Sequence, residues 1–270
     1  MFSAFFAAVT SMVPLETMAP IISEHAQPKY SNNEKHFAYL APDARGAYNL
    51  HVDGKCLTHA RRAISQFFWE PDDEHLLYLY DEEGSENAHL FRVNLDGVSE
   101  DLTPYSDVHV EFVTMSESKP NQALIRMNLR DSRYLDCYQI DLVSKEVCPA
   151  SEFVDCRNNV FADDDLLPIV CINYQPNGQK FLEVYEDREW HPIWTLDPDD
   201  WYPTVMRLSN GGQKVVLLTA TGLSARGVVA IDKKTGACEL LFSHPKLDCI
   251  GCYFDGFQGL TSSSLQYLLY

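Results

Sequence analysis

The stretch that decides the fold class runs from Arg61 to Tyr105 and reads RRAISQFFWEPDDEHLLYLYDEEGSENAHLFRVNLDGVSEDLTPY. It contains four short apolar runs, at residues 65–69, 75–80, 89–95 and 99–102. Turn residues at 71–73 and 96–97 separate these runs, since proline presets φ, aspartate bonds its own backbone and glycine takes positive φ. The pattern therefore predicts a four-stranded antiparallel meander.

The first turn of this unit recurs along the chain. Its copies begin with small or polar residues and lie at 31–35, 71–74, 116–120, 162–165, 209–213 and 255–258. The spacing of roughly 40 to 47 residues is typical of four-stranded propeller blades. A single blade buries its faces only against neighbouring blades, so the repeat predicts a radial array. No segment has helical periodicity, and the chain is predicted to be an all-β propeller.

The predicted organisation is a lead-in segment at 1–29 followed by a β-propeller at 30–270, with about five complete blades and part of a sixth. The predicted blades are 30–60, 61–106, 107–154, 155–198, 199–246 and a partial 247–270. Pro168 falls inside a strand of the fourth blade, which predicts an edge-like or bulged strand there. An incomplete propeller also predicts exposed apolar side chains on the fifth blade, at 215–218 and 228–231.

The charge balance excludes several classes of partner. The 270 residues carry a formal net charge of -18, whereas phosphate binding needs clustered Lys and Arg. We therefore predict no nucleic-acid partner and no adsorption to anionic membranes. Residues 1–12 are apolar but lack the positive start of a signal peptide, and no stretch is long enough to span a bilayer. The predicted location is the cytoplasm.

The eight cysteines are scattered through predicted strands, which is typical of reduced, buried thiols. Cys249 and Cys252 have the spacing of metal ligands, but they form a lone pair without the second pair that zinc sites need. In an extended strand their side chains would also point to opposite faces. The sequence therefore predicts no metal site and no cofactor.

The sequence offers no catalytic residue. A nucleophile elbow needs Gly-x-Ser-x-Gly on a strand-to-helix turn. The nearest match surrounds Ser224, where the second glycine, Gly227, falls one position late and the context is a predicted β-hairpin. We expect Ser224 to be an unreactive loop residue, because a serine without a base and an oxyanion hole is a poor nucleophile.

The strongest charge cluster lies in the predicted loop at 81–86, which reads DEEGSE. Several carboxylates in one loop could bind a cation or a peptide amine, while the alternative is a solvated loop without a ligand. Two arginines precede the same blade and could meet a carboxylate of a partner. The candidate substrate- or partner-binding residues are Glu82, Glu83, Glu86, Arg61 and Arg62.

A family resemblance covers roughly residues 14–255; it is carried mainly by the first two blades and continues into the third at 128–131 and 138–142. Residues 27–42, QPKYSNNEKHFAYLAP, resemble the propeller opening of prolyl oligopeptidase family serine peptidases. Residues 64–73 and 78–97, with DLTPY at 101–105, resemble a blade of that family more closely still. Blade repeats alone are less specific, because TolB-like and WD40-like propellers share them. Residues 256–264 depart from the family pattern, and a truncated, frame-shifted or split-gene product would explain this.

The resemblance implies a function. In that family the propeller caps an α/β-hydrolase domain and admits short peptides, while the Ser-Asp-His triad belongs to the hydrolase domain. No residue of that triad can be assigned to this chain, so its own residues leave open whether it is an enzyme. We expect the N-terminal propeller of such a peptidase, with a C-terminal α/β-hydrolase domain or chain as partner and peptides as substrates. The alternative is a self-standing TolB-like propeller that binds a protein or peptide.

Overall fold

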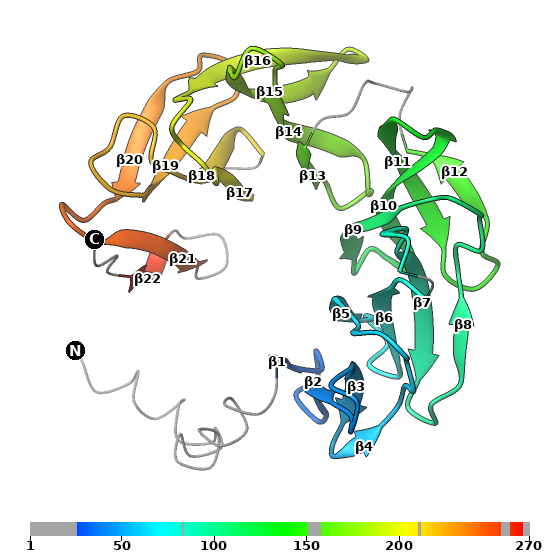
Figure 1. Ribbon diagram of the computed structural model, residues 1–270. Coiled ribbons are helices and arrows are strands. Elements are labelled where there is room, and N and C mark those ends of the chain that lie inside the picture. Colours follow the sequence, from blue (N-terminus) through cyan, green and yellow to red (C-terminus); the bar gives the residue numbers. More distant parts are fainter. Residues whose placement is uncertain (1–25, 83, 151–157, 210–211, 255–259, 267–270) are drawn as a thin grey trace. The chain divides into compact units, whose positions relative to one another are not determined.

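The computed structural model describes residues 26–82, 84–150, 158–209, 212–254 and 260–266, and every regular element among them is a β-strand (Figure 1). These strands form five four-stranded sheets and one two-stranded sheet, all antiparallel. The fold is the predicted all-β propeller, with five complete blades and part of a sixth. No helix among the described residues is long and apolar enough to cross a membrane.

The chain divides into two compact units, residues 1–135 with 140–147, and residues 136–139 with 148–270. The first unit holds the first two blades and most of the third. Its strands are β1 (Ala26–Tyr30), β2 (Phe37–Pro42), β3 (Tyr48–Val52), β4 (Lys55–Cys56), β5 (Gln66–Trp69), β6 (His75–Tyr80), β7 (His89–Asn94), β8 (Ser99–Asp101), β9 (Val110–Ser116), β10 (Lys119–Asp131), β11 (Tyr134–Asp141) and β12 (Val147–Pro149). The first sheet thus begins inside the segment predicted as a lead-in.

The second unit holds the remaining sheets. Its strands are β13 (Asn158–Ala162), β14 (Pro168–Tyr174), β15 (Lys180–Glu186), β16 (Glu189–Leu196), β17 (Thr204–Ser209), β18 (Lys214–Thr219), β19 (Gly227–Asp232), β20 (Cys238–Phe242), β21 (Asp248–Phe254) and β22 (Leu260–Gln266). Sequence neighbours are spatial neighbours within every sheet. Short hairpin turns thus account for the whole strand order.

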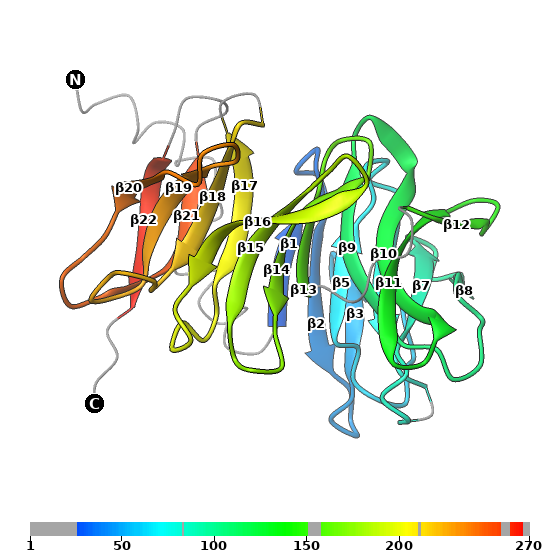
Figure 2. The ribbon, with the colours of Figure 1, turned by 90° about the horizontal axis from the view of Figure 1, so that it is seen from above.

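The second blade shows how the turn residues set the register. Its strands β5 to β8 lie side by side in Figure 1, and β7 and β8 are neighbours in Figure 2. The carboxylate of Asp72 accepts hydrogen bonds from the backbone N–H groups of Glu74 and His75. Gly97 adopts φ of 93°, as its type predicts. The acceptor in this second turn is the side chain of Asn94, which binds the N–H groups of residues 96 and 98. The four-stranded meander is confirmed.

Side chains join the first blade to the second at about the repeat length. The carboxylate of Asp73 is 9% exposed, and it accepts from the backbone N–H of Asn32 at 2.6 Å, 41 residues earlier, and from the N–H of Asn33 at 3.0 Å. Lys55 Nζ donates to the carbonyl of Leu95, 40 residues later. A shared apolar core, including Leu40, Phe67 and Leu76, lies beneath these bonds. Residues about one repeat apart in the sequence are therefore in contact between these neighbouring blades.

For the fourth blade, the bulged alternative is confirmed and the edge-like one is not, while the expectation for the fifth blade is corrected. Strand β14 pairs with both β13 and β15, so it is not an edge strand. Pro168 is its first residue, where a missing N–H removes no interior bond, and the register with β13 is irregular there. The predicted exposed faces at 215–218 and 228–231 are buried, because they pack against the fourth blade and against Cys249.

Candidate functional site

The acidic loop between β6 and β7 is organised by Asp81. Its Oδ1 accepts from the N–H groups of Gly84 and Ser85 at 2.7 and 3.2 Å, and its Oδ2 accepts from the N–H of Glu86 at 3.0 Å. Gly84 and Glu86 both adopt positive φ, which turns their N–H groups inward. The loop thus folds around one carboxylate, which the sequence analysis did not single out.

The predicted site residues differ in how they contact this loop. Glu82, Glu86, Arg61 and Arg62 are exposed, and Glu83 lies outside the described residues. The guanidinium of Arg62 lies directly against the loop, since a Cβ at Gly84 would clash with Arg62 Nη1. Arg61 is anchored through its backbone, whose N–H donates to the hydroxyl of Tyr80 at 3.1 Å.

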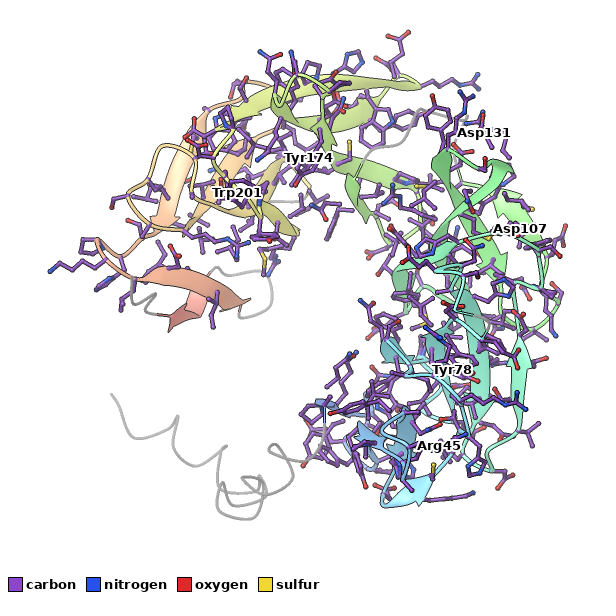
Figure 3. The ribbon with its side chains drawn as sticks, in the orientation of Figure 1. Arg45, Tyr78, Asp107, Asp131, Tyr174 and Trp201 are labelled. Carbon is purple, nitrogen blue, oxygen red and sulfur yellow. The ribbon has the colours of Figure 1, made fainter. Side chains whose placement is uncertain are left out.

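A pocket of about 310 Å³ opens beside the loop. It is bounded by the ends of β6 and β7 and by the segment at 104–107. We call it the acidic pocket, because four carboxylates line it and, among the described residues, no Lys or Arg does; Figure 3 labels one of the four, Asp107. The carboxylates belong to Asp81, Glu82, Asp101 and Asp107.

His89 adds an oriented ring to the acidic pocket. Its Nδ1 lies 2.8 Å from Asp101 Oδ2, and its ring stacks with Phe91 at 6.5 Å between centroids. Asp101 is held in turn by the backbone N–H of Thr103 at 2.8 Å. The sequence analysis missed His89, Asp101 and Asp107. The hairpin at 96–97 pairs Phe91 with Asp101. From this register, the proximity of His89 to Asp101 could have been deduced from the sequence.

The electrostatics of the loop favour an ionised Asp81. Burial is the largest single influence on the pKa of Asp81 and acts to raise it. The hydrogen bonds from Glu86, Gly84 and Ser85, with the nearby charge of Arg62, outweigh burial and lower the pKa below its usual value. The acidic pocket is therefore negatively charged at neutral pH, and it could bind a metal ion, an amine or a guanidinium group.

A second acidic cluster in the same blade holds an ion-pair network. One ligand atom each from Glu70, Asp72 and His75 lies within 4.8 Å of the others, which is close enough for a metal ion. Both oxygens of Glu70, however, accept from Arg92, each at 2.8 Å, and His75 Nδ1 lies 2.7 Å from Asp72. Burial raises the pKa of Glu70. The arrangement fits an Arg–carboxylate pair better than a cation site.

The serine near the incomplete nucleophile elbow does not lie on the kind of turn that such an elbow needs. Ser224 is exposed in the loop that joins β18 to β19, a strand-to-strand connection instead of the strand-to-helix turn of a nucleophile elbow. Cys249, the first member of the cysteine pair, is buried against Val216, Leu218 and Val228. It packs there as an apolar side chain.

Comparison with known proteins connects this fold to peptidases. No family model matches the chain. A curated relative, dipeptidyl aminopeptidase BIII of Pseudoxanthomonas mexicana, is 26% identical over 218 residues. The match covers 77% of this chain but only 31% of the relative. Over most of its length, this chain is therefore similar to part of an aminopeptidase. The expected resemblance is confirmed.

Solved structures agree on the fold. The propeller domain of the Trilobed protease from Pyrococcus furiosus superposes with a TM-score of 0.55 at 12% identity, covering 86% of this chain and 75% of that one. A putative TolB from Agrobacterium tumefaciens gives 0.52 at 15%, covering 81% and 80%. A puromycin-hydrolysing peptidase of Mycobacterium tuberculosis gives 0.52 at 12%, covering 80% and 37%. At these identities the likeness establishes the propeller fold alone.

Proposed function

We propose that this chain is the propeller portion of a prolyl oligopeptidase-family serine peptidase, and that it controls the access of peptides to an α/β-hydrolase domain. The observation that carries the proposal is the match to dipeptidyl aminopeptidase BIII, which covers most of this chain and less than a third of that protein. The relative therefore has ample length for a separate catalytic domain. Ser224, the serine of the incomplete nucleophile elbow, lies in this chain on a loop between two strands.

Under this proposal, the acidic pocket is the site that meets the substrate. Asp81 and Asp101 are fixed by backbone N–H groups, so their charge costs little reorganisation when a cation arrives. Glu82 and Glu86 are exposed at the rim of the same loop. The amino group or a basic side chain of a peptide would bind there. Arg62, against Gly84, would favour a peptide carboxylate next to it.

A chimera tests the proposal. The segment of dipeptidyl aminopeptidase BIII that matches this chain would be replaced by this chain, and hydrolysis of a dipeptide anilide would be compared with hydrolysis of a long, unstructured peptide. We expect the chimera to prefer the short substrate, as a gating propeller would. The control is the relative with the matched segment deleted. Equal discrimination by the chimera and by this deletion variant would contradict the gating role.

A second candidate function is a self-standing propeller that binds a protein or peptide. It is favoured by the match to the putative TolB, which covers 80% of that chain. The gene sequence downstream of this chain separates the two candidates. An open frame with Gly-x-Ser-x-Gly followed by Asp and His supports the peptidase, because those residues form the family's triad. Binding of a partner by the purified chain without such a frame supports the self-standing propeller.

A further inference from the structure

A second pocket of about 710 Å³ lies in the first unit and is larger than the acidic pocket. It is formed by β1, by β5, and by the hairpin of β9 and β10. Its volume falls within the usual range for small-molecule sites. We call it the aromatic pocket, after the rings that line it. Its lining includes Lys29, Tyr30, Phe68, Trp69, Phe112 and Met115.

The rings of the aromatic pocket are held in fixed positions. Phe68 and Phe112 stack at 3.8 Å between centroids with an interplanar angle of 24°, and both are half-buried. Trp69 is 8% exposed, and its Nε1 donates to the carbonyl of Lys29 at 3.4 Å. Tyr30 remains 45% exposed beside them. A rigid aromatic wall of this kind binds apolar rings at low cost in conformational entropy.

Lys29 gives the pocket a cation in an unusual setting. Its Nζ donates to the carbonyl of Phe67 and lies 4.7 Å from the ring centroids of both Phe67 and Phe68. Burial lowers the pKa of Lys29. Among the residues that the structure describes, no carboxylate lies within 4.0 Å of its ammonium. A half-buried ammonium without an anion gains from a ligand that brings one.

We propose that the aromatic pocket binds an aromatic carboxylate, such as the C-terminal phenylalanine of a short peptide. The ring would lie against Phe68, Phe112 and Met115, and the carboxylate would pair with the Lys29 ammonium. An aromatic amine fits less well, because Lys29 repels it and Glu117, the one carboxylate of the lining, is exposed. The proposal stands whether or not the chain acts with a hydrolase domain.

Methionine methyl groups report on this binding directly. The chain has six methionines, and a 13C label on their methyl groups gives few NMR signals. Met115 lines the pocket, Met127 is fully buried in β10 of the same sheet, and Met206 lies in the second unit. The probes are N-acetyl-phenylalanine and its uncharged amide. We expect a saturable shift of the Met115 signal with the acid at millimolar concentration, and constant Met127 and Met206 signals.

The amide should bind about tenfold more weakly than the acid, because it cannot pair with Lys29. A Met115 signal that stays constant with both probes overturns the pocket. Equal affinity for both probes overturns the role of Lys29. A Met115→Leu variant assigns the signal, and an unchanged Met127 signal confirms that each further variant is folded.

Two lysine variants separate the charge from the fold. Lys29→Met keeps most of the apolar stem and removes the ammonium, so it should bind the acid and the amide equally. Lys55→Met is the matched control, because Lys55 Nζ also donates to a carbonyl of the next blade but lines neither pocket. It should retain the tenfold preference. A Lys29→Met variant that keeps this preference would contradict the proposal.

Discussion

The two pockets of the first unit differ in how the chain builds them. The acidic pocket comes from one blade and the segment that follows it, within residues 80–107. The aromatic pocket draws on three successive blades, within residues 29–120. The acidic run at 81–86, which supplies two of the four carboxylates of the acidic pocket, is easy to notice in the sequence, whereas rings about one repeat apart are not. In a repeat sequence, the features that are easiest to recognise lie within one short segment, whereas a pocket can be formed by residues that are one repeat apart.

The pockets also differ in what their charged groups already bind. In the acidic pocket, Asp81 accepts three backbone N–H groups, and Asp101 accepts from Thr103 and contacts His89. In the aromatic pocket, Lys29 has a carbonyl and two rings but no described carboxylate. The acidic residues therefore have a structural role that needs no ligand. The ammonium of Lys29, by contrast, could form an ion pair with the carboxylate of a ligand.

The largest expected effect concerns a carboxylate that lines neither pocket. Glu70 is 1% exposed and is paired with Arg92, so Arg92→Met leaves a buried, unpaired carboxylate. We expect the free energy of unfolding to fall by about 3 kcal/mol, measured by urea denaturation. The double variant Glu70→Leu, Arg92→Met should recover part of this loss. A single variant as stable as the wild type would mean that burial does not decide which acidic residues matter in this blade.

The next effect concerns the wall of the aromatic pocket. Phe112→Ala removes the ring stacked on Phe68, and we expect a loss of about 2 kcal/mol, below the range for fully buried rings because Phe112 is half-buried. The same measurement on Tyr202→Ala is the control, since Tyr202 is 76% exposed in the second unit. Equal losses in the two variants would show that the stacked pair contributes nothing specific.

A smaller effect is expected at the acidic pocket. Asp81→Ala removes three hydrogen bonds of an exposed loop whose N–H groups can turn to water, so the loss should be about 1 kcal/mol. Glu82→Gln, in the same loop, should change the stability by less than about 0.5 kcal/mol. If the Glu82 variant were the more damaging of the two, the loop would not be organised around Asp81.

The smallest effect is a pH dependence. The pKa of Asp81 is lower in the folded chain than the unfolded value of about 3.9, so its contribution to stability is present above that pH and is lost as the pH falls through the folded pKa. Asp81→Asn should therefore flatten the decline of stability between about pH 5 and pH 3. Thermal melting across this range measures it. A parallel decline in both proteins would remove Asp81 from the acid response.

The blade and its repetition follow from the sequence alone. Alternating apolar runs with Pro71 and Gly97 between them specify strands and tight turns, because those preferences act over a few residues. The same local signals indicated the acidic loop at 81–86. In the fourth blade, Pro168 suggested an edge-like or bulged strand, and the strand is an inner one with an irregular register at Pro168. The apolar faces at 215–218 and 228–231 were predicted to be exposed, but neighbouring strands bury both.

Which carboxylates accept backbone hydrogen bonds, and which rings form a pocket, depends on tertiary packing. Nothing in the order of residues distinguishes Asp81, with three N–H donors, from Glu82 beside it. Nor does it show that Phe68 and Phe112, on first strands of successive blades, stack with Lys29 close to Phe68. Such contacts depend on how one blade packs against the next. Packing is set by the whole buried surface, whereas the sequence pattern records the preferences of each short segment.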